Sequence, residues 1–280
     1  MNELPPLNVA QLLRQFDLTP KKGLGQNFLA DPAALERITA AAEITPDSAV
    51  LEIGPGLGSL TRHLAQQARR VVAVELDERF LPVLAEVLHP WNNITIVQGD
   101  ILDQQPDALM QESGYLVVAN IPYYITSAVI RHLLESACKP QRIVLTIQEE
   151  VARRVCAAPG DLSLLALSVQ VYGQPKLAVR IPAGAFYPAP KVDSAALRID
   201  LYPQPRIPAP LLNTFFTLAK AGFSQKRKTL RNAISGGMGW PAQQTEELLA
   251  RAGIDPQRRA QTLNLEEWKR LCEVAGKVGL

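Results

Sequence analysis

The sequence is poor in the residues that hold metals or form cross-links. Its 280 residues include three cysteines and three histidines, and none of them has the spacing of a CxxC pair or a zinc site. Metal sites need several such ligands close together, so the sequence predicts no metal cofactor. Isolated cysteines are typical of reduced thiols that pack as small apolar groups, which indicates a reducing compartment.

Long apolar runs are also missing. No stretch approaches the roughly 18 apolar residues that a membrane-spanning helix requires, and the N-terminus lacks the basic-then-apolar order of a secretory signal. We therefore expect a cytoplasmic protein that makes no membrane contact. With 47% hydrophobic and 20% charged residues, the chain can bury the core of one large domain or two unequal ones.

The net charge of +2 hides an uneven distribution. Residues 1–185 carry 15 lysines and arginines against 19 acidic residues, and residues 186–280 carry 14 against 8, so the two parts are −4 and +6. A basic C-terminal part suits contact with a polyanion. A solvated basic surface is the commoner explanation of any single cluster.

Short apolar segments alternate with helical patterns over the first two thirds of the chain. Such alternation is typical of a parallel sheet covered by helices on both faces. Asp31 and Pro32 mark the start of a helix that runs to residue 42. The predicted fold is α/β, with a Rossmann-like, seven-stranded, mostly parallel sheet whose last two strands form a hairpin-like edge. The expected strands are residues 49–53, 71–75, 94–98, 115–120, 142–148, 176–181 and 195–201.

A proline-rich stretch divides the chain. Residues 202–210, YPQPRIPAP, hold four prolines in nine positions, which is typical of a linker. We predict a sheet domain over residues 1–204 and a small all-α domain over residues 205–280. Helical segments are expected near residues 211–221, 225–234, 242–252 and 265–278.

The stretch YLVVANIPYY, residues 115–124, ends an expected strand with an asparagine, a proline and two aromatics. The Asn120 side-chain oxygen and the Ile121 carbonyl would accept from the exocyclic amine of adenine, whose lone pair is otherwise delocalised into the ring. Pro122 stiffens the turn, and Tyr123 would stack on the extruded base. An ordinary Asn-Pro turn after a strand is the alternative.

A glycine-rich turn, LEIGPGLGSLT, follows the first expected strand. Gly54 and Gly56 would let a ligand approach the backbone closely because no Cβ obstructs it. A dinucleotide-binding loop would have its third glycine where this chain has Ser59. The turn therefore favours another nucleoside-containing cofactor. The alternative is that the glycines end the strand and have no role in binding a ligand.

The next two strands end in acidic residues that suit an adenosine. Glu75 is placed to bind both hydroxyls of a ribose. Asp100 would accept from the adenine amino group, and Ile101 would pack on its ring. Together with the glycine turn, these residues indicate an adenosine-type cofactor.

Two loops would complete the site. KKGLGQNFL, residues 21–29, would fold over a ligand with Asn27 and Leu29 facing it, or would be a mere connector. In the proline-rich loop AGAFYPAPKVDS, Phe186 would stack on the base from the side opposite Tyr123, and Lys191 would contact a phosphate. A structural turn with Phe186 in the core fits its composition equally well.

The segment AKAGFSQKRKTLRNAI is basic, and no acid interrupts residues 220–234. Clustered cations of this kind favour contact with a nucleic-acid backbone, and a solvated helix face is the alternative. The residues expected to contact RNA here are Lys226, Arg227, Lys228 and Arg231.

Seven blocks, in order and spacing, resemble the ribosomal RNA adenine dimethyltransferases, and among them the small-subunit enzymes. The resemblance covers residues 21–267. It implies a class I methyltransferase that uses S-adenosyl-L-methionine to form N6,N6-dimethyladenine at two adjacent positions near the 3′ end of 16S rRNA in the immature 30S particle. We expect it to act as a monomer. The blocks are KKGLGQNFL, LEIGPGLGSLT, VELD, QGDIL, NIPYY, FYPAPKVDS and GFSQKRKTLRN.

The resemblance also assigns roles to residues. It places Asn120 to Tyr123 around the target amine and Phe186 over the base. The family's aromatic-glycine pair is replaced here by Leu164 and Leu165, so the resemblance does not define the shape of that neighbouring wall. The residues assigned to the cofactor are Asn27, Leu29, Gly54, Glu75, Asp100 and Asn120.

Three other functions share part of this pattern. A DNA adenine methyltransferase has the Asn-x-Pro-aromatic turn, and an assembly or transcription factor can keep the fold without catalysis. A nicotinamide oxidoreductase is disfavoured by Ser59 and by the lack of an evident proton donor. The KVDS block and the basic segment favour the small-subunit target over that of the large-subunit resistance methyltransferases.

Overall fold

The computed structural model describes residues 4–277. The chain divides into two compact units: Met1–Ala152 with Pro175–Leu201, and Arg153–Gln174 with Tyr202–Leu280. The second unit therefore takes in residues 153–174 as well as the C-terminal helices. No helix in the described range combines the length and apolarity needed to traverse a bilayer.

The first unit is built on a seven-stranded sheet with the order β4-β3-β2-β5-β6-β9-β7, which confirms the predicted α/β class. Strands β4, β3, β2, β5 and β6 are parallel, and β9 runs antiparallel to β6. The strand order reverses between β2 and β5, the place where such sheets bind ligands beyond their C-terminal ends. The bounds are β2 Ala49–Ile53, β3 Arg70–Glu75, β4 Ile94–Gln98, β5 Leu116–Asn120, β6 Arg142–Gln148, β7 Gly173–Ile181 and β9 Ser194–Leu201.

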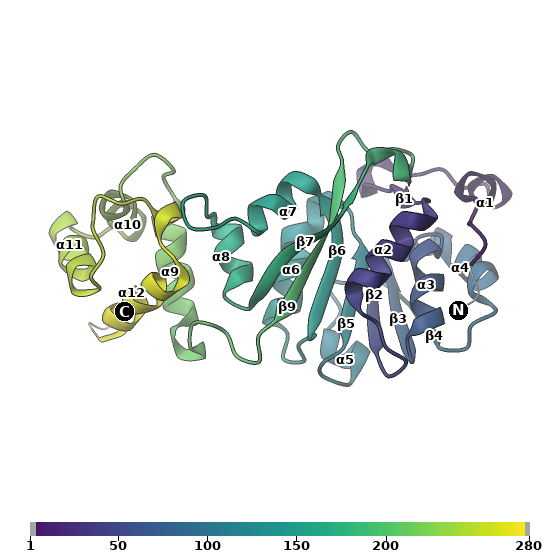
Figure 1. Ribbon diagram of the computed structural model, residues 1–280, viewed down its shortest axis with the longest axis horizontal. Helices are drawn as coiled ribbons and strands as arrows, with labels where there is room; N and C mark the ends of the chain where they lie inside the picture. The colour runs from purple at the N-terminus through teal and green to yellow at the C-terminus, as the bar shows by residue number, and fades with distance from the viewer. Residues whose placement is uncertain (1–3, 278–280) are drawn as a thin grey trace. The chain divides into compact units, whose positions relative to one another are not determined.

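Burial explains which strands lie in the middle. Every residue of β2 is buried, and so are the first four of β5, whereas β4 at the edge is half exposed. Continuous apolar strands fit a sheet that is covered on both faces. Figure 1 shows α2 and α3 in front of the strands and α6 behind them.

Helix α2 of the first unit begins where the sequence provides a cap. Asp31 accepts a hydrogen bond from the Ala34 backbone N–H at 2.6 Å, and Pro32 is the first residue of α2, as predicted. Leu35 and Ile38 of α2 pack with Leu64 of α3 in one buried cluster on the sheet. The bounds are α1 Val9–Gln15, α2 Pro32–Ala42, α3 Ser59–Gln67, α4 Leu81–Leu88, α5 Pro106–Met110 and α6 Thr126–Glu135. Helix α7, Glu149–Val155, includes the division between the two units after Ala152.

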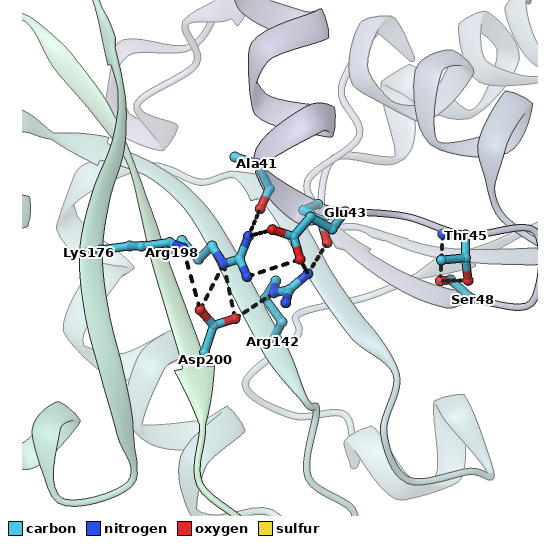
Figure 2. Close-up of polar contacts among 9 residues, drawn as sticks. Ala41, Glu43, Thr45, Ser48, Arg142, Lys176, Arg198 and Asp200 are labelled. Carbon is cyan, nitrogen blue, oxygen red and sulfur yellow. Dashed lines mark hydrogen bonds and ion pairs between the residues drawn. The ribbon is translucent and has the colours of Figure 1, made fainter.

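Charged side chains form a network at the N-terminal end of the parallel strand β6, the opposite end from the predicted site (Figure 2). Arg198 contacts Glu43 at 2.5 Å and Asp200 at 2.9 Å. Arg142 contacts the same two carboxylates at 2.8 Å and 2.6 Å. Arg198 also donates to the carbonyl of Ala41 at the end of α2. The network therefore fastens the C-terminal end of α2 to β6 and β9.

The second unit is helical around a core that includes Phe215, Ile234, Leu249 and Trp268, all fully buried. A Cβ at Gly222 would lie 2.9 Å from the Trp268 ring, so α9 and α12 can approach because this position is a glycine. The bounds are α8 Leu164–Gln170, α9 Leu212–Phe223, α10 Leu230–Met238, α11 Ala242–Arg251 and α12 Leu265–Lys277.

The helix expected at residues 225–234 is wrong in its first half, because α10 begins only at Leu230. Residues 225–228 precede the helix, and Thr229 caps it by accepting from the Asn232 backbone N–H at 3.5 Å. Cations are unfavourable at the positive end of the helix dipole, which explains the late start. The expected end of the last helix at residue 278 lies outside the described residues.

The proline-rich segment after β9 is anchored within the second unit. The backbone N–H of Tyr202 donates to Tyr172 at 2.9 Å, and that of Arg206 donates to Val171 at 2.8 Å. Ile207 is fully buried. The prolines have no backbone N–H to donate. The backbone N–H groups of the other residues still hold the segment in place, so it is not a flexible linker.

Candidate active site

A cavity opens at the C-terminal ends of the parallel strands in the first unit. It encloses about 1050 Å³ of space, its open mouth included. All the residues predicted from the sequence to bind a cofactor or hold the target base line this cavity, so the fold brings them together from six separate segments. They are Asn27, Leu29, Gly54, Gly56, Glu75, Asp100, Ile101, Asn120, Ile121, Pro122, Tyr123 and Phe186.

The glycine turn between β2 and α3 is held by Glu75. Gly54 and Gly56 have φ of +69° and +56°, which L-residues with side chains adopt rarely. The carboxylate of Glu75 accepts from the backbone N–H of Gly56 at 2.9 Å and from that of Asp77 at 2.8 Å. Burial raises the pKa of Glu75 despite these bonds. A carboxylate has about four acceptor positions, so ribose hydroxyls can still be accepted.

Asp100 and Ile101 follow β4 and form another wall. One carboxylate oxygen of Asp100 accepts from the Leu102 backbone N–H at 2.9 Å, which fixes the side chain. Ile101 is buried. A fixed acceptor beside an apolar side chain is the arrangement that an adenine ring with an amino group would match.

Asn120 ends β5 with its side chain held in one orientation. Its Nδ2 donates to the backbone carbonyl of Asn27 at 3.0 Å, and only the amide nitrogen can donate to a carbonyl. The Oδ1 atom is thereby assigned to the other side, and it has no hydrogen-bond partner among residues 4–277. Asn120 thus offers an acceptor to the cavity.

Tyr123 is fixed by a hydrogen bond to strand β9. Its hydroxyl lies 2.7 Å from Oγ of Ser194, a fully buried residue of β9. Thr126 donates to the Tyr123 carbonyl at 3.0 Å and holds the short 3₁₀ helix Tyr123–Ile125. Burial raises the pKa of the Tyr123 phenol. The ring is a rigid wall suited to stacking.

Phe186 belongs to a small ribbon that joins two loops. Strand β1, Phe28–Leu29, pairs antiparallel with β8, Phe186–Tyr187. The Ala30 backbone N–H donates to the Ala185 carbonyl at 2.9 Å. Phe186 lines the cavity but is only 5% exposed. Phe186 therefore packs in the core and borders the cavity, and its stacking opposite Tyr123 stays a prediction.

Sequence reasoning gave no role to Asp77 or Gln26, which anchor the N-terminal loop. Asp77 accepts from Gln26 Nε2 at 3.0 Å and lies 3.7 Å from Lys21 Nζ. The paired Arg79 guanidinium holds the pKa of Asp77 well below its usual range. Both residues belong to segments that resemble the family, VELD and KKGLGQNFL. Their hydrogen bond could not be predicted, because it depends on how the chain folds.

Glu52 was also missed, since it reads as a residue within a strand. Its side chain lines the floor of the cavity, it is 1% exposed, and its Oε2 atom has no partner among the described residues. Burial, aided by the nearby charge of Glu75, raises the pKa of Glu52 to about 8. Glu52 is therefore mostly protonated at neutral pH.

The predicted RNA contacts lie in both units. Lys191 is exposed in the first unit, and Lys226, Arg227 and Lys228 are exposed in the turn before α10. Arg231 is half buried and contacts Glu246 at 3.2 Å. The described residues contain no group of three or more His, Cys, Asp or Glu placed to hold a metal ion.

Residues 18–277 match the family described as Ribosomal RNA adenine dimethylase. The Ribosomal RNA small subunit methyltransferase A of Dehalococcoides mccartyi (strain CBDB1) is 46% identical over 95% of this chain and 92% of its own. The protein of the same name from Bacillus pumilus (strain SAFR-032) is 38% identical over 97% of each chain.

Solved structures agree with these sequence relatives. A dimethyladenosine transferase from Plasmodium falciparum has a TM-score of 0.78 at 25% identity, covering 90% of this chain and 98% of its own. The 23S rRNA methyltransferase ErmE has a TM-score of 0.71 at 31% identity, covering 89% of this chain and 99% of its own. The chain belongs to the ribosomal RNA adenine dimethylase family.

Proposed function

We propose that this protein dimethylates N6 of two adjacent adenosines near the 3′ end of 16S rRNA, with S-adenosyl-L-methionine as methyl donor. The observation that carries the proposal is the orientation of Asn120. Its Nδ2 is committed to the Asn27 carbonyl at 3.0 Å, so its Oδ1 is left to accept from an amine. A free acceptor at this point of the cavity, next to the Ile121 carbonyl, suits an exocyclic amine, which has two N–H bonds to donate.

The residues of the cavity fit this cofactor. The glycine turn admits a ligand against the backbone, and Glu75 and Asp100 present carboxylates for the ribose and the adenine. Two buried atoms of the wall, Glu52 Oε2 and Ser59 Oγ, have no partner among the described residues, and the amino-acid end of such a cofactor would provide polar partners. When bound, it supplies an electrophilic methyl group on a sulfonium.

The protein's own contribution is position and polarisation. Asn120 Oδ1 and the Ile121 carbonyl would accept the two N–H bonds of the amine and turn its lone pair out of the ring plane. Tyr123, fixed by Ser194, would stack on the extruded base. Methyl transfer would then be direct, without a covalent enzyme intermediate: N6 would bond to the methyl carbon as the carbon–sulfur bond breaks. The amine would then lose one proton to water, so no general base is assigned. Acceptors on one side of the amine leave room for a first methyl group during the second transfer.

The substrate would be the rRNA of the immature 30S particle, bound by a cytoplasmic monomer. Lys226, Arg227 and Lys228 are exposed before α10 and would contact phosphates, as would Lys191. Such contacts supply salt-dependent affinity, while the cavity supplies the choice of base. Arg231 would be shared between RNA and Glu246, which it already contacts at 3.2 Å.

The test is methyl transfer from labelled S-adenosyl-L-methionine to immature small-subunit particles, followed by mass spectrometry of the rRNA. Wild-type protein should yield dimethyladenine at two neighbouring positions. Asn120→Ala should lose most of the transfer, by about 100-fold or more, while particle binding stays nearly intact. Retained turnover in Asn120→Ala would remove this residue from the mechanism.

Two further assays separate the rival functions. Offering duplex DNA in place of particles tests a DNA adenine methyltransferase, because label would then enter the DNA. Cells that lack this chain should contain 16S rRNA without the two dimethyladenines, and Asn120→Ala should not restore them. Rescue of particle assembly by the inactive variant would reveal an additional role in binding.

A further inference from the structure

The two tyrosines of the NIPYY block differ in their surroundings. Tyr123 is half buried and hydrogen bonded to Ser194. Tyr124 is 63% exposed, although it also lines the cavity, and its hydroxyl has no partner among residues 4–277. A side chain that is both cavity-lining and mostly solvent-exposed stands at the mouth.

The local backbone explains why the two rings diverge. They are successive residues of the 3₁₀ helix Tyr123–Ile125, in which each residue turns the chain by about 120° because there are three residues per turn. With Tyr123 held against β9, Tyr124 is directed to a different side. The sequence therefore places one aromatic inside the cavity and a second one at its entrance.

The N-terminal loop supports Tyr124 and adds charge. A Cβ on Gly25 would come into van der Waals contact with Cδ1 of Tyr124, at 3.7 Å, so the ring lies close to the loop at a residue without a side chain. Lys22 of the same loop is exposed, and the side chain of Lys21 is 51% exposed. An exposed aromatic ring at a ligand site, with exposed lysines on the neighbouring loop, is a combination that suits single-stranded nucleic acid, because the ring can stack on a base and the cations attract phosphate.

We propose that Tyr124 is a stacking platform for the nucleotide next to the target adenosine. The inference rests on the proposed function and adds a second base-binding position to it. Extruding one base into the cavity removes a stacking partner from its neighbour. Tyr124 replaces that partner at the entrance, and Lys21 and Lys22 attract the backbone beside it. With two adjacent target adenosines, one occupies the cavity while the other waits on Tyr124.

The experiment compares aromatic and aliphatic residues at position 124. Methyl transfer to immature small-subunit particles is measured for Tyr124→Phe, Tyr124→Leu and Tyr124→Ala. Stacking of one base on an aromatic side chain is worth roughly a five- to hundredfold change in affinity. We expect about a tenfold or larger loss of kcat/KM for the particle in the Leu and Ala variants and less than twofold in the Phe variant.

Controls distinguish stacking from structure. The KM for S-adenosyl-L-methionine and the melting temperature should stay unchanged in Tyr124→Leu, which keeps an apolar side chain against Gly25. Tyr187→Ala is the matched control, because Tyr187 is 46% exposed but does not line the cavity, and it should keep wild-type kinetics. Should Tyr124→Ala fail to fold, the Phe and Leu variants still decide the question.

Two results would overturn the platform. One is wild-type kcat/KM for the particle in Tyr124→Leu, and the other is an equal loss in Tyr187→Ala. Failure of the proposed function is a different result, because the wild-type protein itself would then transfer no methyl group to the particle.

Discussion

Gln26 and Asp77 are joined by a hydrogen bond of 3.0 Å between side chains 51 positions apart in the sequence. Gln26 also accepts from the Lys21 backbone N–H at 2.7 Å. The same amide therefore shapes the N-terminal loop and ties it to the end of β3, where Glu75 holds the glycine turn. Ordering of this loop is thus coupled to the part of the cavity proposed to bind the ribose.

Gln26→Ala should weaken cofactor binding. A hydrogen bond to a charged group is worth about 1.5–3 kcal/mol, and part of that would be recovered through Lys21, so we expect roughly a five- to tenfold increase in Kd for S-adenosyl-L-methionine. Isothermal titration calorimetry measures it. Gln15→Ala is the control, because Gln15 donates to Glu86 at 2.9 Å on the exposed surface. Equal affinity in both variants would contradict the coupling.

Glu52→Gln should make stability less dependent on pH. The folded pKa of Glu52 is raised to about 8, above its ordinary value near 4.3. The folded state therefore holds this proton while the unfolded state releases it, and stability falls as pH rises from about 5 to 8. The wild type should lose about 1 kcal/mol per pH unit relative to Glu52→Gln in that window.

The measurement for Glu52 is urea unfolding of both proteins at a series of pH values. Below pH 4 the difference between them should no longer change with pH, because Glu52 is then protonated in both states. Parallel stability curves between pH 5 and pH 8 would show that Glu52 is ionised in the folded protein.

Arg198→Met should destabilise the fold without altering the chemistry. Arg198 is 6% exposed and contacts both Glu43 and Asp200. Its loss leaves Glu43 with Arg142, and Asp200 with Arg142 and the more distant Lys176 at 3.8 Å. Breaking a buried pair costs about 3–5 kcal/mol, but Glu43 is partly exposed to water, so we expect about 1–3 kcal/mol. Chemical denaturation measures the loss.

The control for Arg198 is Arg131→Ala. Arg131 makes an exposed ion pair with Glu135 on α6 at 2.9 Å, and such pairs contribute about 0.3–0.5 kcal/mol. Methyl transfer at 20 °C should be unchanged in both variants, because the network lies at the far end of the sheet from the cavity. A drop in kcat for folded Arg198→Met would refute that separation.

Replacing Lys226, Arg227 and Lys228 together by alanine should weaken binding to all RNA sequences by a similar factor and reduce the salt dependence of binding. Each neutralised phosphate contributes about 0.7–0.9 to the slope of log K against log salt, so three lost contacts lower the slope by about 2–3. Filter binding of immature particles at several salt concentrations measures this slope. An unchanged slope would show that these exposed cations face solvent in the complex.

Much of the sheet could be predicted because its strands are locally apolar. Residues 49–53, 94–98 and 142–148 form strands with the predicted bounds. The start of α10 was not predicted, because hydrophobic periodicity does not report the electrostatic effect of cations at a helix N-terminus. The contact between Gln26 and Asp77 could not be predicted either, because it joins residues that are distant in the sequence and meet only in the folded chain. Tyr123 and Tyr124 are the same residue type side by side, and only the structure separates the buried one from the exposed one.

Strands β1 and β8 pair with each other in a sheet of their own. The N-terminal loop and the loop of residues 183–194 are thereby stitched together, although they are distant in sequence. We therefore expect a displacement of Leu29 to be transmitted to Phe186 through this pairing. The two loops should therefore move together when a ligand enters or leaves the cavity. Lengthening either loop should change the rates of ligand binding and release.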